Sequence, residues 1–423
     1  MNSRERLQAA IEHRKPDRVP IDLGSTKNTG ISASVLYNMR KALGLPEKDI
    51  HVEELFWLLG RVDEDVRRLL GVDVVGIGWP ADVFGVKHTG GKPFKMNDGT
   101  PLIIGNNSAI NRMPDGNTYL YPQGDISAQP SAVMPPEGYF FDSIDRVEPF
   151  DESNLTPLED FKDDFKVIDD ETAKYLEKQS IDLYEGTEYG IVGFMGGGGL
   201  GETSRLPGMQ LKHPKGIRKF ADWLAAHLLY PEYLHAIFQM QTEIILKNFE
   251  IYKQAVGERI QVIGWSCTDF GTQHGPFISP ELFRTLYKPY YKKMNDWVHQ
   301  NTNWKTYYHC CGSVVALLDD FVDMGMDILN PIQLSAKDMD AHMLKEKYGD
   351  KLVFWGGAVD TQATLPFGTP QQVREQVLER MEILSANGGY VFNGIHNIVA
   401  KTPAENVIAM YRAAAEFNQT MYS

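Results

Sequence analysis

The 423-residue sequence has no excess of positive charge and no long apolar run. Its 42 Lys and Arg residues stand against 56 Asp and Glu residues, which gives a formal net charge of −14. Nucleic acids and anionic membrane surfaces are bound by basic faces, so neither is expected as the main partner. No apolar segment approaches the roughly 20 residues of a membrane-spanning helix. The first 20 residues are too charged for a signal peptide.

Cysteine is also scarce. Cys267, Cys310 and Cys311 are too few for a disulfide framework, so a reducing cytoplasm is the expected location. Hydrophobic residues make up 43% of the chain and charged residues 23%, which favours a packed core over disorder. These features predict a soluble globular protein of the cytoplasm, with an enzyme as the leading class.

Short and nearly continuous apolar runs recur along the chain, separated by segments with helical periodicity. Such runs are typical of parallel strands that are buried on both faces. Thr369-Pro370 and Thr402-Pro403 are typical starts of capped helices. The pattern predicts one (β/α)8 barrel over residues 1–423, with a doubly wound open sheet as the alternative. The eight predicted strands are Arg18–Asp22, Val72–Gly78, Tyr189–Met195, Ile260–Ser266, Thr306–Cys311, Asp327–Ile332, Leu352–Gly357 and Tyr390–Ile395.

A barrel needs about 250 residues, so the chain must also hold a large insertion. The segment 84–163 differs in composition from the rest of the chain. Asn97-Asp98-Gly99 and Asp115-Gly116-Asn117 are hairpin-turn signals near the strand-like runs Pro101–Ile104 and Thr118–Tyr121. We expect a β-rich insertion between the second and third strands that forms a lid or a rim over one mouth of the barrel.

Reactive groups in such barrels come from the carboxyl ends of the strands and from the loops that follow. Asp269, after the fourth strand, is a candidate acid or base, with capping of a loop or helix as an equal alternative. The run Gly196–Gly201 formally matches GxGxxG. No helix start follows it, so dinucleotide binding is disfavoured and a flexible loop that lets substrate approach the backbone is expected. The residues expected to bind substrate at the mouth are Asp22, Met195, Gly196, Trp265, Asn330, Gln333 and Asn393. For Asn330, Gln333 and Asn393, stabilisation of the loops is an alternative of at least equal weight.

The motif with the most chemical content lies on the fifth predicted strand. Residues two apart on a strand face the same side, so His309 and Cys311 can face the mouth together while Cys310 faces the helices. Imidazole nitrogen and thiolate sulfur are ligands that zinc prefers. His396, after the last strand, is the first choice for a third ligand, and Cys267 is the second. A buried cysteine pair beside a hydrogen-bonded histidine is the alternative interpretation.

Eight motifs follow one another along the chain: Arg14–Pro20, Gly196–Gly201, Ile278–Phe283, His309–Gly312, Leu329–Gln333, Phe354–Gly357, Phe367–Pro370 and Thr402–Val407. In this order they resemble the motifs of the uroporphyrinogen decarboxylase superfamily, over nearly the whole chain. This resemblance implies a (β/α)8 barrel. True decarboxylases of the family have an arginine-rich motif after the first strand that binds the porphyrinogen carboxylates, whereas Asp22–Asn28 holds no arginine. Haem-pathway decarboxylation is therefore disfavoured, because an acidic substrate needs cations.

The superfamily includes corrinoid-dependent methyltransferases, with His-x-Cys on the fifth strand and a second cysteine before the carboxyl-terminal Thr-Pro motif. His309 and Cys311 match the first part, and His396 stands in the second place. The resemblance therefore implies a zinc site of these three residues. An imidazole in place of a thiolate makes zinc a harder Lewis acid, which suits an ether or hydroxyl oxygen better than a thiol.

The hypothesis from the sequence is a zinc-dependent methyltransferase. Zinc would polarise the oxygen of a small methoxylated substrate, and the methyl group would pass to the cobalt of a separate corrinoid protein docked at the barrel mouth. Asp269 or Glu202 would assist with a proton or orient the substrate. The direction of transfer and a homodimer stay open. The alternatives are a decarboxylase without metal, a non-catalytic corrinoid-binding barrel and a zinc hydrolase.

Overall fold

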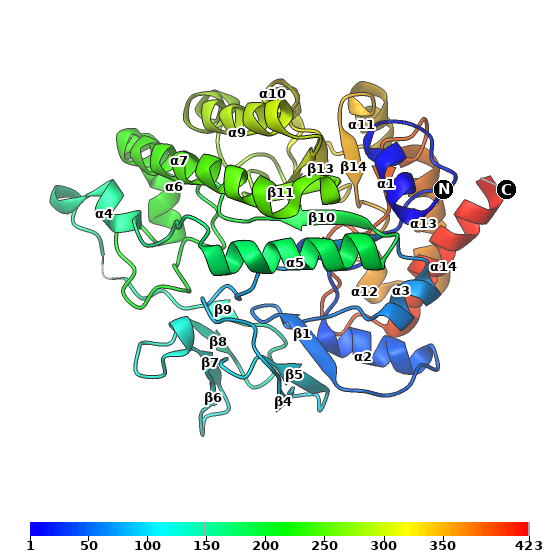
Figure 1. The fold of residues 1–423 in the computed structure, drawn as a ribbon, viewed down its shortest axis with the longest axis horizontal. Helices are drawn as coiled ribbons and strands as arrows, with labels where there is room; N and C mark the ends of the chain where they lie inside the picture. The colour runs from blue at the N-terminus through cyan, green and yellow to red at the C-terminus, as the bar shows by residue number, and fades with distance from the viewer. Residues whose placement is uncertain (148, 422–423) are drawn as a thin grey trace.

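The computed structural model describes residues 1–147 and 149–421, and its centre is a curled parallel sheet of seven strands (Figure 1). The strands follow the order β15-β14-β13-β12-β11-β10-β3. Each strand overlaps one of the predicted runs, so seven of the eight predicted strands are confirmed. Their bounds are β3 Val74–Ile77, β10 Gly190–Phe194, β11 Val262–Ser266, β12 Lys305–His309, β13 Ile328–Asn330, β14 Val353–Trp355 and β15 Tyr390–Val391.

The first predicted strand, Arg18–Asp22, forms isolated bridges instead of a regular strand. Ile21 bridges Phe392, just beyond β15, and Asp22 bridges Val74 of β3, both in parallel. The Asp22 N–H donates a 2.9 Å hydrogen bond to the Phe392 carbonyl oxygen. This segment therefore touches both edge strands of the seven-stranded sheet.

Helix α1 (Ser3–Ile11) closes the amino-terminal end of the sheet. Its side chains Leu7, Ala10 and Ile11 are buried in one cluster with a valine, isoleucine or aromatic side chain from each of the seven strands. Leu7 packs directly on Gly190 at the start of β10, where a Cβ atom would lie 2.5 Å from the leucine Cδ2 atom. In Figure 1, α1 and both chain ends lie on the side of the molecule away from α4 and α6. The carboxyl ends of the strands therefore face the other way.

The longer helices pack on the outside of the sheet, and Figure 1 shows α5 and α7 running beside β10 and β11. Thr369 and Gln372 form the predicted capping box at the start of α13. Within the described residues, no helix has both the length and the hydropathy of a membrane span. The helices are α2 Ala33–Ala42, α3 Glu64–Leu70, α4 Pro157–Phe161, α5 Asp170–Gly186, α6 Phe220–Leu229, α7 Pro231–Val256, α8 Pro280–Leu282, α9 Lys288–Asn301, α10 Leu318–Asp323, α11 Ala341–Tyr348, α12 Thr364–Phe367, α13 Pro370–Leu384 and α14 Ala404–Met421.

Two small sheets lie beside the main sheet, and most of their strands fall between β3 and β10. The predicted runs Pro101–Ile104 and Thr118–Tyr121 correspond to β5 and β7. The orders are β2-β1-β5-β4 and β6-β7-β8-β9. Strands β1 and β2 precede the segment 84–163, so the first small sheet joins two separate parts of the chain. The bounds are β1 Ile50–Glu54, β2 Leu59–Gly60, β4 Lys92–Lys95, β5 Pro101–Ile104, β6 Ile110–Arg112, β7 Thr118–Leu120, β8 Ala132–Met134 and β9 Asp142–Ser143.

Candidate metal centre

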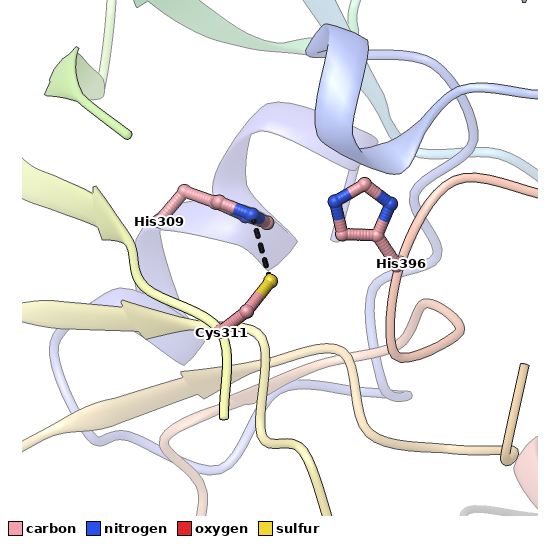
Figure 2. Close-up of side chains that lie close together, drawn as sticks. All are labelled: His309, Cys311 and His396. Atoms are coloured by element: carbon pink, nitrogen blue, oxygen red, sulfur yellow. Dashed lines mark hydrogen bonds between the residues drawn. The ribbon is translucent and has the colours of Figure 1, made fainter. Parts of the chain in front are cut away.

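His309, Cys311 and His396 lie together at the carboxyl end of the main sheet (Figure 2). Their potential ligand atoms are all within 4.8 Å of one another. The Cys311 Sγ atom lies 3.2 Å from His309 Nε2, and the two imidazole centroids are 5.0 Å apart. His309 ends β12, Cys311 follows two residues later, and His396 comes from the loop after β15. In the described part of the chain, no other group of three His, Cys, Asp or Glu ligand atoms is this compact.

Hydrogen bonds at Nδ1 determine the tautomers of His309 and His396. His309 Nδ1 lies 2.7 Å from Asn330 Oδ1, and Asn330 Nδ2 donates a 2.9 Å bond to the Trp355 carbonyl oxygen. Because that second bond fixes which amide atom faces the ring, we assign the proton of His309 to Nδ1. His396 Nδ1 likewise lies 2.6 Å from Asn397 Oδ1. Each Nε2 atom therefore keeps its lone pair, an arrangement typical of metal-binding histidines.

The protonation states of the three residues suit a cation. Burial lowers the pKa of His309 and the pKa of His396 to about 4, so both imidazoles are neutral at neutral pH. Burial raises the pKa of the Cys311 thiol well above its usual value, and the nearby Asp269 carboxylate raises it further. A bound cation would stabilise the thiolate and release that proton. Two neutral imidazoles and one thiol that ionises on binding form a donor set that fits zinc.

The other two cysteines lie outside this group. The Cys267 thiol accepts a 3.2 Å hydrogen bond from Asn28 Nδ2, and burial raises its pKa to about 12. Cys310 is 2% exposed and accepts a hydrogen bond from the Phe270 N–H, on the helix side of the sheet. The alternation along the strand predicts that orientation. The geometry therefore favours His396 over Cys267 as the third ligand.

Asp269 lies directly behind Cys311, because the loops after β11 and β12 touch. Its Oδ1 atom accepts a 2.6 Å hydrogen bond from the Cys311 N–H, and burial raises its pKa. A Cβ atom on Gly271 would lie 2.5 Å from the Cys311 carbonyl oxygen. A Cβ atom on Gly312, whose φ is +88°, would lie 2.3 Å from the Gly271 carbonyl carbon. These two glycines permit the backbone contact that places Asp269 against the centre.

Two residues that the sequence analysis did not select lie next to His396. Trp57, from the loop between β1 and β2, packs edge-on against His396 with ring centroids 6.3 Å apart. Lys27, in the 3-10 helix Lys27–Thr29, lies over the Trp57 ring at 5.2 Å and 3.9 Å from the Glu202 carboxylate. Lys27 follows the first predicted strand, so the rule that selected Asp22 could have found it. No comparable signal pointed to Trp57.

Four of the polar residues predicted at the mouth are buried and bonded to the protein. The Asp22 carboxylate accepts hydrogen bonds from Ser25 and from Trp355 Nε1, and burial raises its pKa to about 6. Gln333 Oε1 accepts the Gly312 N–H, Asn393 Nδ2 donates to the Asp22 carbonyl oxygen, and Asn330 holds His309. Through these hydrogen bonds the four residues stabilise the loops around the centre, and Asn330 also orients the candidate ligand His309.

Trp265 faces away from the mouth, so its predicted place there is wrong. The side chain is fully buried against Phe249 of α7 and Tyr308. Side chains alternate along a strand, and Val262 of β11 belongs to the interior cluster. A residue three positions later must therefore point into the helix layer.

The glycine loop that begins with Met195 and Gly196 is anchored at several points. Gln241 Nε2 donates hydrogen bonds to the carbonyl oxygens of Gly197 and Gly199, and the Leu200 N–H donates to the Tyr291 hydroxyl. The Gly198 N–H donates to the Trp265 carbonyl oxygen. The expected flexible loop is thus held along most of its length. Gly196 is its most open position, since a Cβ atom there would meet nothing within 4 Å.

The fold and the donor set together define an α/β protein with a candidate metal centre at the carboxyl end of a curled parallel sheet. Residues 210–417, just under half of the chain, match the family model for uroporphyrinogen decarboxylase (URO-D). The match confirms the family resemblance and includes His309, Cys311 and His396.

Solved structures of other proteins share the fold of this chain. A solved structure of a methyltransferase from Methanosarcina mazei covers 99% of this chain and 99% of its own, with a TM-score of 0.56 and 19% sequence identity. At that identity the likeness shows a shared fold. A comparison with curated protein sequences gave no match.

Proposed function

We propose that the protein is a zinc-dependent methyltransferase that moves a methyl group between a small methoxylated substrate and the cobalt of a corrinoid protein. The observation that carries this proposal is the cluster of His309, Cys311 and His396, whose protonation and spacing suit one zinc ion. The family match and the methyltransferase among the similar structures support the class of reaction.

The proposed architecture is a (β/α)8 barrel in a single domain of residues 1–423, with 84–163 as an insertion. The bridges of Ile21 and Asp22 to both edge strands support an eighth position between β15 and β3. The corrinoid protein would dock at the carboxyl end of the strands, because α1 fills the other end.

His309, Cys311 and His396 would hold the metal. When bound, zinc would supply Lewis acidity toward the substrate oxygen that bears the methyl group. Three protein donors are typical of catalytic zinc sites, whereas structural sites have four. Asn330 and Asn397 orient the imidazoles through Nδ1, and Asp269 positions Cys311 through its backbone N–H.

The two carboxylates predicted from the sequence take different roles in this proposal. Burial and the nearby charge of Glu202 raise the pKa of Asp269, so Asp269 can hold a proton close to the reacting atoms. Glu202 is 9% exposed, lies beside Lys27 and accepts a 2.8 Å hydrogen bond from the Ser204 hydroxyl. We assign to Glu202 the orientation of substrate, together with the open backbone at Gly196.

The first experiment is a measurement of metal content in the purified protein by mass spectrometry. About one zinc per chain is expected in the wild type and its loss in His309→Ala, Cys311→Ala and His396→Ala. His274→Ala is the matched control, since His274 is an exposed histidine on the loop after β11. Zinc-containing protein is then assayed for methyl transfer from methoxy compounds to a Co(I) corrinoid.

Two results would contradict the proposal. Wild-type protein without metal, even after zinc is supplied, would remove the zinc mechanism and favour a decarboxylase or a binding protein. Zinc-containing protein that methylates a thiol from methylcobalamin but demethylates no methoxy compound would show that the substrate class is wrong.

A further inference from the structure

Lys27 is an ammonium group fixed at the edge of the candidate centre. Its neighbours in the chain hold the backbone in place, since the Thr26 N–H donates to the Thr29 hydroxyl and Asn28 donates to Cys267. The Lys27 side chain is 16% exposed, and its Nζ atom lies over the ring of Trp57. Trp57 in turn contacts His396. The ammonium group and the candidate ligand His396 therefore contact the same indole ring.

The Lys27 ammonium group has one long ion pair and a cation–π contact, and it forms no hydrogen bond to a side chain or backbone oxygen of the described residues. Its nearest carboxylate, Glu202, is 3.9 Å away, whereas Lys48 and Lys212 form ion pairs of 2.7 and 2.6 Å elsewhere in the protein. Among the described residues, none accepts a hydrogen bond from Lys27 Nζ. A sheltered charge without a hydrogen-bond acceptor is costly, so an acceptor on a ligand would be stabilising.

The ion pairs around Lys27 leave one positive charge unpaired. Glu202 is shared between Lys27 and Arg205, each 3.9 Å away, so these three side chains sum to one positive charge. Two other nearby carboxylates form no ion pair with Lys27: Asp269 accepts a hydrogen bond from the Cys311 N–H, and Glu54 accepts from the Phe56 and Trp57 N–H groups. Burial raises the pKa of Glu54, which favours its uncharged form.

We propose that Lys27 binds a carboxylate of the substrate, so that the substrate is a small monocarboxylic acid that bears a methoxy group. The methoxy part of this inference rests on the proposed function, whereas the carboxylate part rests on Lys27 and its surroundings. A single lysine suits one carboxylate and does not suit the several carboxylates of a porphyrinogen. The carboxylate would lie over the Trp57 side of the mouth and the methoxy group beside His396.

The test is a calorimetric binding measurement with two matched pairs of probes, 3-methoxybenzoate with 3-methoxybenzamide and methoxyacetate with methoxyacetamide. Each amide keeps the approximate shape of its acid without the charge. The wild type is expected to bind the acid of at least one pair about 10- to 100-fold more tightly than its amide. Lys27→Met should abolish that preference and Lys27→Arg should retain it. Lys292→Met is the control, because Lys292 is a half-exposed lysine on α9.

Metal-free and zinc-loaded protein are compared, because a carboxylate can also ligate zinc. Equal binding of acid and amide by the wild type would overturn the inference. An acid preference that requires zinc and survives Lys27→Met would also overturn it. If Lys27→Met does not fold, the wild-type preference in metal-free protein decides, and it must weaken with added salt.

A separate assay distinguishes this inference from the proposed function. An acid preference that depends on Lys27, in a protein that transfers no methyl group to any corrinoid, would contradict the methyltransferase and keep the anion site. If methyl transfer from neutral methoxy compounds were as fast as from the matching acids, the proposed methyltransferase function would stand and carboxylate binding by Lys27 would be contradicted.

Discussion

Single residues determine whether the centre can take a cation at neutral pH. Asn330 commits one nitrogen of His309 to a hydrogen bond, and its own amide is oriented by the Trp355 carbonyl oxygen. Burial keeps the imidazoles of His309 and His396 neutral, and burial keeps the Cys311 thiol protonated. Metal binding must therefore displace one proton and no more.

Zinc binding is expected to release about one proton per chain between pH 6 and 8. The pKa of each histidine is about 4, so neither loses a proton in this range, whereas the raised pKa of Cys311 means that its thiol does. The apparent zinc affinity should therefore rise about tenfold for each pH unit. Calorimetric titrations in buffers of different ionisation enthalpy measure the number of protons. Release of three protons would show charged histidines, and release of none would show that Cys311 is not a ligand.

The sequence was most informative for residues whose position depends on local periodicity. His309 and Cys311 were found because residues two apart on a strand share a face, and His396 was selected for its place after the last strand. Lys27 and Trp57 were missed for different reasons. Lys27 lies in the loop after the first predicted strand, where the strand-end rule was applied only to Asp22. Trp57 is placed by long-range contacts of the segment between β1 and β2, such as the hydrogen bond from the Ala33 N–H to the Leu58 carbonyl oxygen.

At the scale of elements, the centre depends on the contact between the loops after β11 and β12. Gly271 and Gly312 cross with their backbones in contact, and that crossing sets the distance between Asp269 and Cys311. The loop contact could not be foreseen, because it pairs segments that are about 40 residues apart in a fold whose strand order had to be known first.

Gly312→Ala is expected to lower the free energy of unfolding by about 2–4 kcal/mol and to weaken zinc binding. The new methyl group would overlap Gly271, and alanine is strained at a φ of +88°. Urea unfolding and a zinc-competition titration measure the two effects. Gly186→Ala at the end of α5 is the matched control, because a Cβ atom there meets nothing within 4 Å. Equal behaviour of the two variants would contradict the importance of the loop crossing.

The strands of the main sheet were predictable because buried parallel strands have nearly continuous apolar sequences. The small sheets were predictable only where turn signals flank them, as at β5 and β7. β1 has the sequence IHVEE, whose polar residues give a weak strand pattern, and it forms because β5 pairs with it in parallel. Trp265 lies on the helix side because side chains alternate along β11 from the inward-facing Val262, and a continuous apolar run does not show which residues face inward.

At the scale of the whole molecule, the candidate ligands join two distant parts of the sheet. His309 and Cys311 belong to β12 and its loop, and His396 belongs to the loop after β15. Strands β13 and β14 lie between them in the sheet. A metal at this centre would connect β12 with β15 across these two strands, and it would stabilise the folded state.

Zinc at 100 times its dissociation constant is expected to stabilise the folded protein by about 2.7 kcal/mol. The measurement is the urea midpoint with zinc and with a chelator. His396→Ala should show no shift of the urea midpoint with zinc, because it removes the candidate ligand that follows β15. His274→Ala should show the same shift as the wild type. A shift of the same size in His396→Ala would mean that zinc acts elsewhere on the protein.

Helix α1 gives the proposed reaction a further property. Since Leu7, Ala10 and Ile11 fill one end of the curled sheet, small molecules and a docking protein would share a single entrance. The small substrate would have to enter before the corrinoid protein covers the opening, and the demethylated product would have to wait for that protein to leave. Turnover would then follow a compulsory order, and an excess of the corrinoid protein would inhibit it by sealing an empty site.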